Sequence, residues 1–276
     1  MFRRSKHKKH SKRDKRHERA KEAREHKIKR RRAKHRESLI ETETQLVKKI
    51  AGWIFQAKGT ALLIIINLVV YFISLGWSEE FFKSMIFMPD KLFQMPQVAS
   101  WFMHANLTHL IGNLIFLFIF GRVVERRFGF IKFLLIYFCA AFTSDIIAGF
   151  VFGQGGIGAS GAIAGLIAAA IIIAPFYLTY VVFGIPTPIV VLGWIAMFAD
   201  ITGLIAPVPG DNVGHIAHLA GFLAITVLIF VLNRKDKDLK FGLLINFITM
   251  IFAGAVYYII PGMSFNKILS VFQKSA

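Results

Sequence analysis

The chain has 276 residues, is 55% hydrophobic and carries a formal net charge of +18, with a mean hydropathy of +0.55. This hydropathy is far above that of a soluble domain and excludes an ordinary water-soluble globular protein. The single cysteine excludes an intrachain disulfide and a cysteine-rich metal site.

The positive charge is concentrated in an N-terminal tail, since residues 1–40 contain 19 Lys+Arg and 5 Asp+Glu. We expect residues 1–37 to form a basic cytoplasmic tail. Residues 38–57 carry apolar side chains at helical spacing, which predicts an amphipathic helix at the membrane interface. Anionic lipid head groups are the simplest partner for such a tail, with nucleic acid or ribosome binding ranked second.

Seven apolar runs follow the tail. A membrane-spanning helix needs roughly 20 residues, or fewer where it is buried among other helices. We therefore predict an all-α polytopic membrane protein with helices over 60–77, 109–121, 130–152, 160–174, 188–206, 214–232 and 241–260.

Basic residues in the short connections predict the orientation of these helices. Segments 121–132 and 233–240 are rich in Lys and Arg and should face the cytoplasm together with the tail. The N-terminus is then cytoplasmic and the C-terminus external, in a multi-pass protein. The lack of a cleavable signal peptide suits the plasma membrane of a prokaryote, archaea included.

Polar side chains stand at the beginning of three apolar runs. Outside the tail the chain has four histidines, in the pairs His104/His109 and His215/His218, while Ser160 begins the fourth run. The predicted orientation brings all three groups to a similar depth. Because polar groups are costly within a membrane and usually mark function, we expect one shared hydrolytic site.

Ser160 has the surroundings that an activated serine needs. A serine hydroxyl requires a base, and a histidine such as His218 can provide one. Free N–H groups at a helix start, and a histidine and an amide at positions i and i+4 (His109 and Asn113), can stabilise an oxyanion. Packing is the competing interpretation, because glycine and serine also mediate close contacts between membrane helices.

Four motifs, in order, resemble those of the rhomboid family of intramembrane serine proteases. They are HANLTHLIGN from His104, GRVVERRFG from Gly121, GASGAIAGL from Gly158 and AHLAGF from Ala217. The resemblance covers residues 58–233 and implies a six-helix catalytic core. Residues 234–276 then add a cytoplasmic loop, a seventh transmembrane helix and a short tail.

The resemblance also implies roles for individual residues. It implies a serine–histidine dyad of Ser160 and His218 with no third acid, no cofactor and no metal, acting on transmembrane protein substrates. The oxyanion positions correspond to His109, Asn113, Ser160 and Gly158, and structural positions near the site to His104, Gly161, Gly221 and Glu125. The chain departs from the family pattern at Met95-Pro96, Ala164 and Ile225.

Two acids within apolar runs, Asp145 and Asp200, could each orient His218. We expect helix-packing hydrogen bonds for both, since most intramembrane acids face the bundle interior. Two other functions stay open. One is a non-catalytic rhomboid-like chaperone for transmembrane helices, and the other is a hydrolase or transporter whose metal is bound by the four histidines.

Overall fold

The computed structural model describes residues 56–180, 184–207, 210–211, 213–232 and 236–259, together with residues 29–30, 34–36, 41–42, 44–45, 48 and 52. The chain divides into two units, residues 1–56 and 57–276. Most of the predicted tail (1–37), most of the predicted amphipathic helix (38–57) and residues 260–276 lie outside the described residues.

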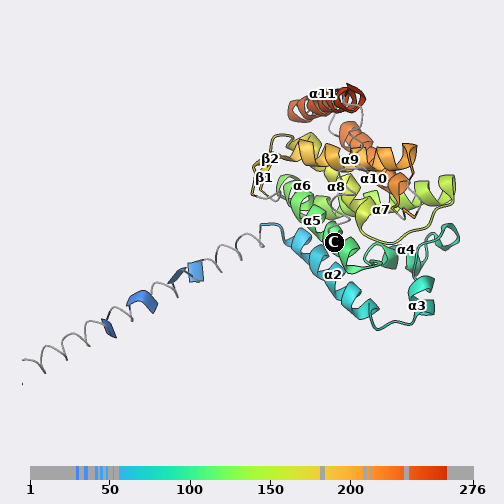
Figure 1. Cartoon of the computed structure of the whole chain (residues 1–276), viewed down its shortest axis with the longest axis horizontal. Helices are drawn as coiled ribbons and strands as arrows, with labels where there is room; N and C mark the ends of the chain where they lie inside the picture. The colour runs from blue at the N-terminus through green and yellow to red at the C-terminus, as the bar shows by residue number, and fades with distance from the viewer. Residues whose placement is uncertain are drawn as a thin grey trace, which may run out of the picture. The chain divides into compact units, whose positions relative to one another are not determined.

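The second unit is built from helices and one two-stranded hairpin (Figure 1). In chain order they are α2 (Lys58–Ser74), α3 (Glu79–Ser84), the 3-10 turn η1 (Pro89–Lys91), α4 (Met95–Ser100), α5 (Leu107–Phe116), the π-helical turn η2 (Leu117–Gly121), α6 (Arg122–Phe128), α7 (Phe130–Ile146), the π-helical turn η3 (Ile147–Val151), α8 (Ser160–Ile173), β1 (Leu178–Thr179), β2 (Thr187–Pro188), α9 (Ile189–Ile205), α10 (His215–Leu232) and α11 (Lys237–Ile259). Strands β1 and β2 pair antiparallel.

Each predicted apolar run coincides with a helix, which confirms the all-α fold class. Among the described residues, three continuous helices are long and apolar enough to cross a membrane: Leu107–Phe128, Phe130–Val151 and His215–Leu232. Helices α2, α8 and α9 are apolar but shorter. The chain is therefore a membrane protein, while its orientation and the identity of its membrane stay predictions. Residues 78–100, which follow the first apolar run, contain the short helices α3, η1 and α4.

Helix α8 lies in the middle of the bundle (Figure 1), and its residues from Gly161 to Ile172 are all buried. The helix consists of glycine, alanine, isoleucine and leucine after Ser160. Membrane helices pack closely where small residues let the backbones approach, since lipid supplies no hydrophobic driving force between them. The composition of α8 thus explains its central position.

Helices α8 and α10 run parallel. A Cβ on Gly161 would lie 3.8 Å from the carbonyl oxygen of Ala217, and a Cβ on Gly165, one turn later, would lie 2.8 Å from Cγ1 of Ile225. The contacts advance along both helices together, so the first turns of α8 and α10 lie side by side. The resemblance implied a glycine at position 225, and Gly165 on the facing helix leaves the room that the larger Ile225 side chain needs.

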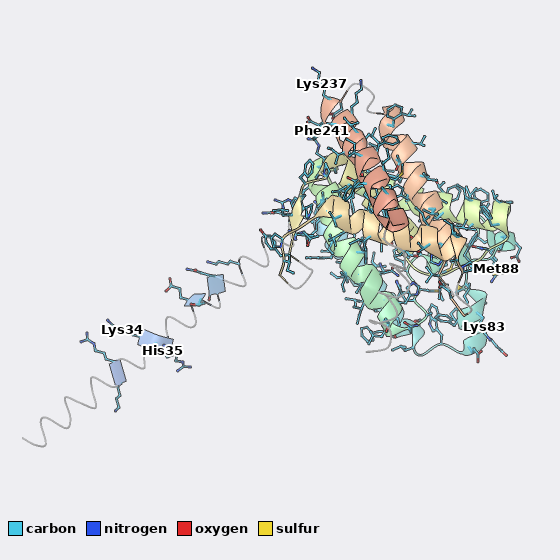
Figure 2. All side chains as sticks on the ribbon, turned by 45° about the horizontal axis from the view of Figure 1, so that its top comes forward. Lys34, His35, Lys83, Met88, Lys237 and Phe241 are labelled. Atoms are coloured by element: carbon cyan, nitrogen blue, oxygen red, sulfur yellow. The ribbon has the colours of Figure 1, made fainter. Side chains whose placement is uncertain are left out.

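The seventh helix, α11, packs against the last turn of α8. Asn246 donates from Nδ2 to the carbonyl oxygen of Ile171 at 2.8 Å, and its Oδ1 accepts from Nε1 of Trp194 on α9 at 3.1 Å. A Cβ on Gly242 would overlap the carbonyl of Ile172. Figure 2 shows Lys237 and Phe241, at the beginning of α11, at the opposite end of this unit from Lys83 and Met88.

Glu125 ties α6 to the beginning of α2. Its Oε1 accepts from the backbone N–H of Gly59 at 2.7 Å, and its Oε2 accepts from the N–H and the hydroxyl of Thr60 at 2.8 and 2.9 Å. The first N–H groups of a helix have no partner within the helix, and a carboxylate near them also interacts favourably with the helix dipole. The Glu125 carboxylate therefore caps α2.

Removing this cap should destabilise the protein. We expect Glu125→Ala to lower the free energy of unfolding by about 3 kcal/mol, because buried donors lose charge-assisted hydrogen bonds. Glu125→Gln keeps one acceptor oxygen and should lose less. Thermal unfolding in detergent measures both, with Glu80→Ala on the exposed side of α3 as the control that should leave the midpoint unchanged. Equal midpoints for Glu125→Ala and the control would contradict a capping role.

Candidate active site

The first turn of α5 presents His109 and Asn113 on one face. Asn106 caps this helix, because its Oδ1 accepts from the backbone N–H of His109 at 2.8 Å. Positions i and i+4 of a helix lie one above the other. The imidazole and the amide are therefore held next to each other at the beginning of α5.

The loop before Ser160 lies against these two side chains. Gly158 has a φ of +117°. A Cβ there would lie 2.8 Å from Cε1 and Nε2 of His109 and 3.5 Å from Nδ2 of Asn113, so only glycine fits without a clash or backbone strain. The N–H of Gly158 donates to the carbonyl of Ser100 at 2.8 Å, which ties the loop to α4.

Two polar atoms next to this loop have no partner. Among the described residues, Nδ2 of Asn113 and Nε2 of His104 are buried without a hydrogen bond. His104 contacts the carbonyl of Phe102 through Nδ1 at 3.2 Å, and its ring packs edge-on against that of His109 at 5.0 Å. Burial, together with the nearby charge of His109, lowers the pKa of His104 to about 4, so its ring is neutral near pH 7. This packing agrees with the structural role expected for His104.

Ser160 and His218 lie at the contact between α8 and α10. A Cβ on Gly221 would overlap the carbonyl oxygen of Gly161, and a Cβ on Gly161 would lie 2.6 Å from Oγ of Ser144 on α7. The His218 ring is near enough to His109 for the two to interact electrostatically. Between Ser160 and His218, both described, the structure contains no hydrogen bond. In unliganded sites such bonds are often long and tighten with substrate.

An acid from α9 contacts both histidines of α10. Oδ1 of Asp200 accepts from Nδ1 of His218 at 2.7 Å and lies 2.8 Å from Nδ1 of His215. Nε2 of His215 in turn lies 3.1 Å from Oδ2 of Asp211. We expected helix-packing hydrogen bonds for Asp200, and these contacts do join α9 to α10, with His215 as a second partner.

The other intramembrane acid follows the expectation. Asp145 on α7 accepts through Oδ2 from Nε1 of Trp101 at 2.7 Å, which is a contact between α7 and the end of α4. The sequence shows two acids in apolar runs, but which one meets His218 depends on how each helix is rotated. The i, i+3 spacing of His215 and His218 is the one sequence signal for this network, because it places both rings on one helix face within reach of a single acid.

Within the part of the chain that the structure describes, one group of side chains could bind a metal ion. Asp200, His215 and His218 each offer an atom, and these atoms lie within 4.8 Å of one another. The separations from Asp200 are hydrogen-bond lengths of 2.7 and 2.8 Å. Ligands bound to zinc at about 2.0–2.2 Å stand roughly 3.3 Å apart in a tetrahedron, so both rings would have to move. The contacts as they stand are those of a hydrogen-bonded network.

Comparison with known proteins identifies the domain that carries these residues. The model of the rhomboid domain family matches residues 94–235, which is more than half of the chain. Rhomboid-like protein 11, chloroplastic, of Arabidopsis thaliana is 29% identical over 67% of this chain and 71% of its own length. Rhomboid protease GlpG of Haemophilus influenzae is 26% identical over 51% and 71%, and rhomboid protease AarA of Providencia stuartii is 29% identical over 47% and 54%.

Enlarging Gly221 should separate α10 from α8. We expect Gly221→Ala to lower the free energy of unfolding by about 1–3 kcal/mol, because overpacking forces the helices apart. Gly112→Ala on α5 is the matched control, since a Cβ there meets nothing within 4 Å. That change should raise stability by about 0.5–1 kcal/mol through helix propensity. Thermal unfolding in detergent measures both variants. A shift of the two midpoints in the same direction would contradict the close contact between α8 and α10 at Gly221.

The buried His104 should make stability depend on pH. Its pKa is about 4 in the folded state, against 6.5 for an exposed ring, so the unfolded state binds more protons between these values. The free energy of unfolding should therefore fall as pH falls from 6.5 to 4. His104→Gln cannot titrate and should flatten this slope, as measured by denaturation at several pH values. An unchanged slope would show that His104 does not contribute to it.

Proposed function

The chain belongs to the rhomboid family, and on that premise we propose that it is a serine endopeptidase that cleaves transmembrane segments of membrane proteins. Several relatives, among them GlpG, AarA and GluP of Bacillus subtilis, are named as rhomboid proteases, which supports proteolysis as the general activity. Our finer proposal makes Ser160 the nucleophile and His218 the general base.

The observation that carries this proposal is that the first turns of α8 and α10 lie side by side. Ser160 is the first residue of α8, and the parallel contact of α8 with α10 brings the first turn of α10 alongside it. When the Ser160 oxygen attacks a substrate carbonyl, Nε2 of His218 takes the hydroxyl proton. His218 then gives that proton to the leaving amine as the peptide C–N bond breaks. Water attacks the resulting ester by the same route, and Ser160 recovers its proton.

The oxyanion formed in each step needs donors that are ready before the reaction. Nδ2 of Asn113 has no partner among the described residues and lies close to Gly158. The imidazole of His109 lies on the same side of that loop. The backbone N–H of Ser160 is one of the free donors of a helix start. We assign these three groups to the oxyanion, with Gly158 giving the substrate backbone room to approach.

The chemistry restricts the substrates. A transmembrane helix hides its amides in hydrogen bonds, and a carbonyl becomes accessible only where the helix opens. Glycine and proline weaken a helix by about 1 and 3 kcal/mol relative to alanine. We therefore propose that the preferred substrates are membrane segments with small or helix-breaking residues near the cleaved bond.

The direct test measures cleavage by the purified full-length protein in detergent. We expect Ser160→Ala and His218→Ala each to lower the cleavage rate of a transmembrane substrate by about 10³-fold or more, as in other serine hydrolases. A fluorophosphonate probe should label Ser160 in the wild-type protein and fail to label it in His218→Ala. Peptide mapping by mass spectrometry locates the label.

Ser144→Ala is the matched control, because Ser144 lies beside Gly161 and its Oγ has no partner among the described residues. This variant should be cleavage-competent and should still be labelled. Cleavage that survives Ser160→Ala would overturn the serine mechanism, and its loss with a chelator would then favour a metal hydrolase. Substrate binding without cleavage by a folded wild-type protein would favour the chaperone.

A further inference from the structure

His218, the general base of the proposed function, contacts Asp200 through Nδ1, the ring nitrogen that does not face Ser160 in the proposed reaction. Nδ1 of His218 lies 2.7 Å from Oδ1 of Asp200, and the two side chains are only 16% and 9% exposed. The contact joins α10 to α9 across 18 residues of sequence. We propose that Asp200 is a positioning residue for His218, so that this chain works with a third, acidic member that its family resemblance does not imply.

This inference rests on the proposed function and adds a reason for the protonation state of His218. A carboxylate only accepts hydrogen bonds, so the contact requires the proton of a neutral ring to be on Nδ1. Nε2 is then unprotonated and can take the proton of the Ser160 hydroxyl. The imidazolium that forms lies beside the carboxylate, which stabilises its positive charge.

The partners of Asp200 satisfy one of its carboxyl oxygens, Oδ1, within an apolar helix. An isolated buried carboxylate is costly unless it is paired. Besides His218, Asp200 faces Nδ1 of His215, whose Nε2 faces Asp211. Both nitrogens of His215 therefore face carboxylate oxygens, and donation by both requires the charged ring. His215 thus contacts the same oxygen of Asp200 as His218 does. Among the described residues, His109 also interacts electrostatically with His218.

The backbone of α9 leaves room for this arrangement. Gly203 follows Asp200 by three residues and shares its helix face. A Cβ at Gly203 would overlap the imidazole of His215. The ring therefore lies directly over the α9 backbone, and the glycine makes that approach possible. Asp200 therefore binds the histidines of α10, and Gly203 leaves the space that the His215 ring occupies.

The chain offers a matched control for a test. Asp145 is also an acid in an apolar helix, but its hydrogen-bonded partner is Trp101. We expect Asp200→Asn to lower kcat of the full-length enzyme by about 100-fold or more, since an amide can donate to Nδ1 and favour the wrong tautomer. KM should change less than about threefold, because a positioning residue acts after substrate has bound. Asp145→Asn should leave kcat within about threefold of wild type.

The pH profile separates positioning from packing. Without the carboxylate the imidazolium is less favoured, so the acidic limb of the kcat profile should move to lower pH by about one unit in Asp200→Asn. Asp200→Glu restores a carboxylate and should keep the limb at its wild-type pH. A merely structural role would lower the amount of folded enzyme and leave the shape of the profile unchanged, which would overturn the inference.

A second measurement needs no activity and no Asp200 variant. In protein labelled with ¹⁵N-histidine, the Nδ1 proton of His218 should give a low-field resonance in the wild type and in Ser160→Ala. This resonance should be absent from the spectrum of His218→Gln. A wild-type spectrum without an Nδ1 proton on His218 would overturn the inference. Equal cleavage rates for wild type and Ser160→Ala would instead overturn the proposed function. The resonance would still test the contact between Asp200 and His218. If cleavage depends on Ser160 but Asp200→Asn has the same kcat and pH profile as the wild type, the inference is overturned and the proposed function stands.

Discussion

The contact between α8 and α10 at Gly161 and Gly221 is the constraint on which the candidate site depends. The carbonyl of Gly161 occupies the volume that any side chain at position 221 would need. Because the helices run parallel, this contact sets the relative height of Ser160, which precedes Gly161, and of His218, one turn before Gly221. Membrane helices gain their packing from small residues and close backbones. The geometry of the candidate site therefore depends on two glycines as much as on Ser160 and His218.

Buried polar side chains connect the rest of the bundle. Glu125 holds α2, Asn246 connects α8, α9 and α11, and Asp200 connects α9 to α10. Each satisfies donors or acceptors that hydrocarbon cannot satisfy. Asn113 differs, since its Nδ2 stays unpaired within the described part of the chain and lies beside the loop before Ser160. An unpaired donor costs stability, and in an oxyanion site that cost prepares the donor for a substrate.

The helices and the main residues of the site were predictable because they depend on local patterns. Apolar runs predict helices, and Ser160, His109 and His218 stand at the starts of such runs. The sequence left Asp145 and Asp200 both open as partners of His218, because the choice depends on the rotation of each helix about its axis, which hydropathy does not define. The same holds for Gly165, whose small size matters only because Ile225 faces it on another helix. What the sequence left open was therefore decided by contacts between distant segments.

The contact of Asn246 with the carbonyl of Ile171 has a consequence for how the protein is made. Ser160 belongs to a helix whose far end is completed by a residue 75 positions later in the chain. During synthesis, α8 enters the membrane before Asn246 has left the ribosome. The packing around α8 is therefore incomplete until α9 and α10 have been inserted and α11 has followed them. Chain order therefore completes the packing around α8 only when α11, the last helix that the structure describes, has been inserted.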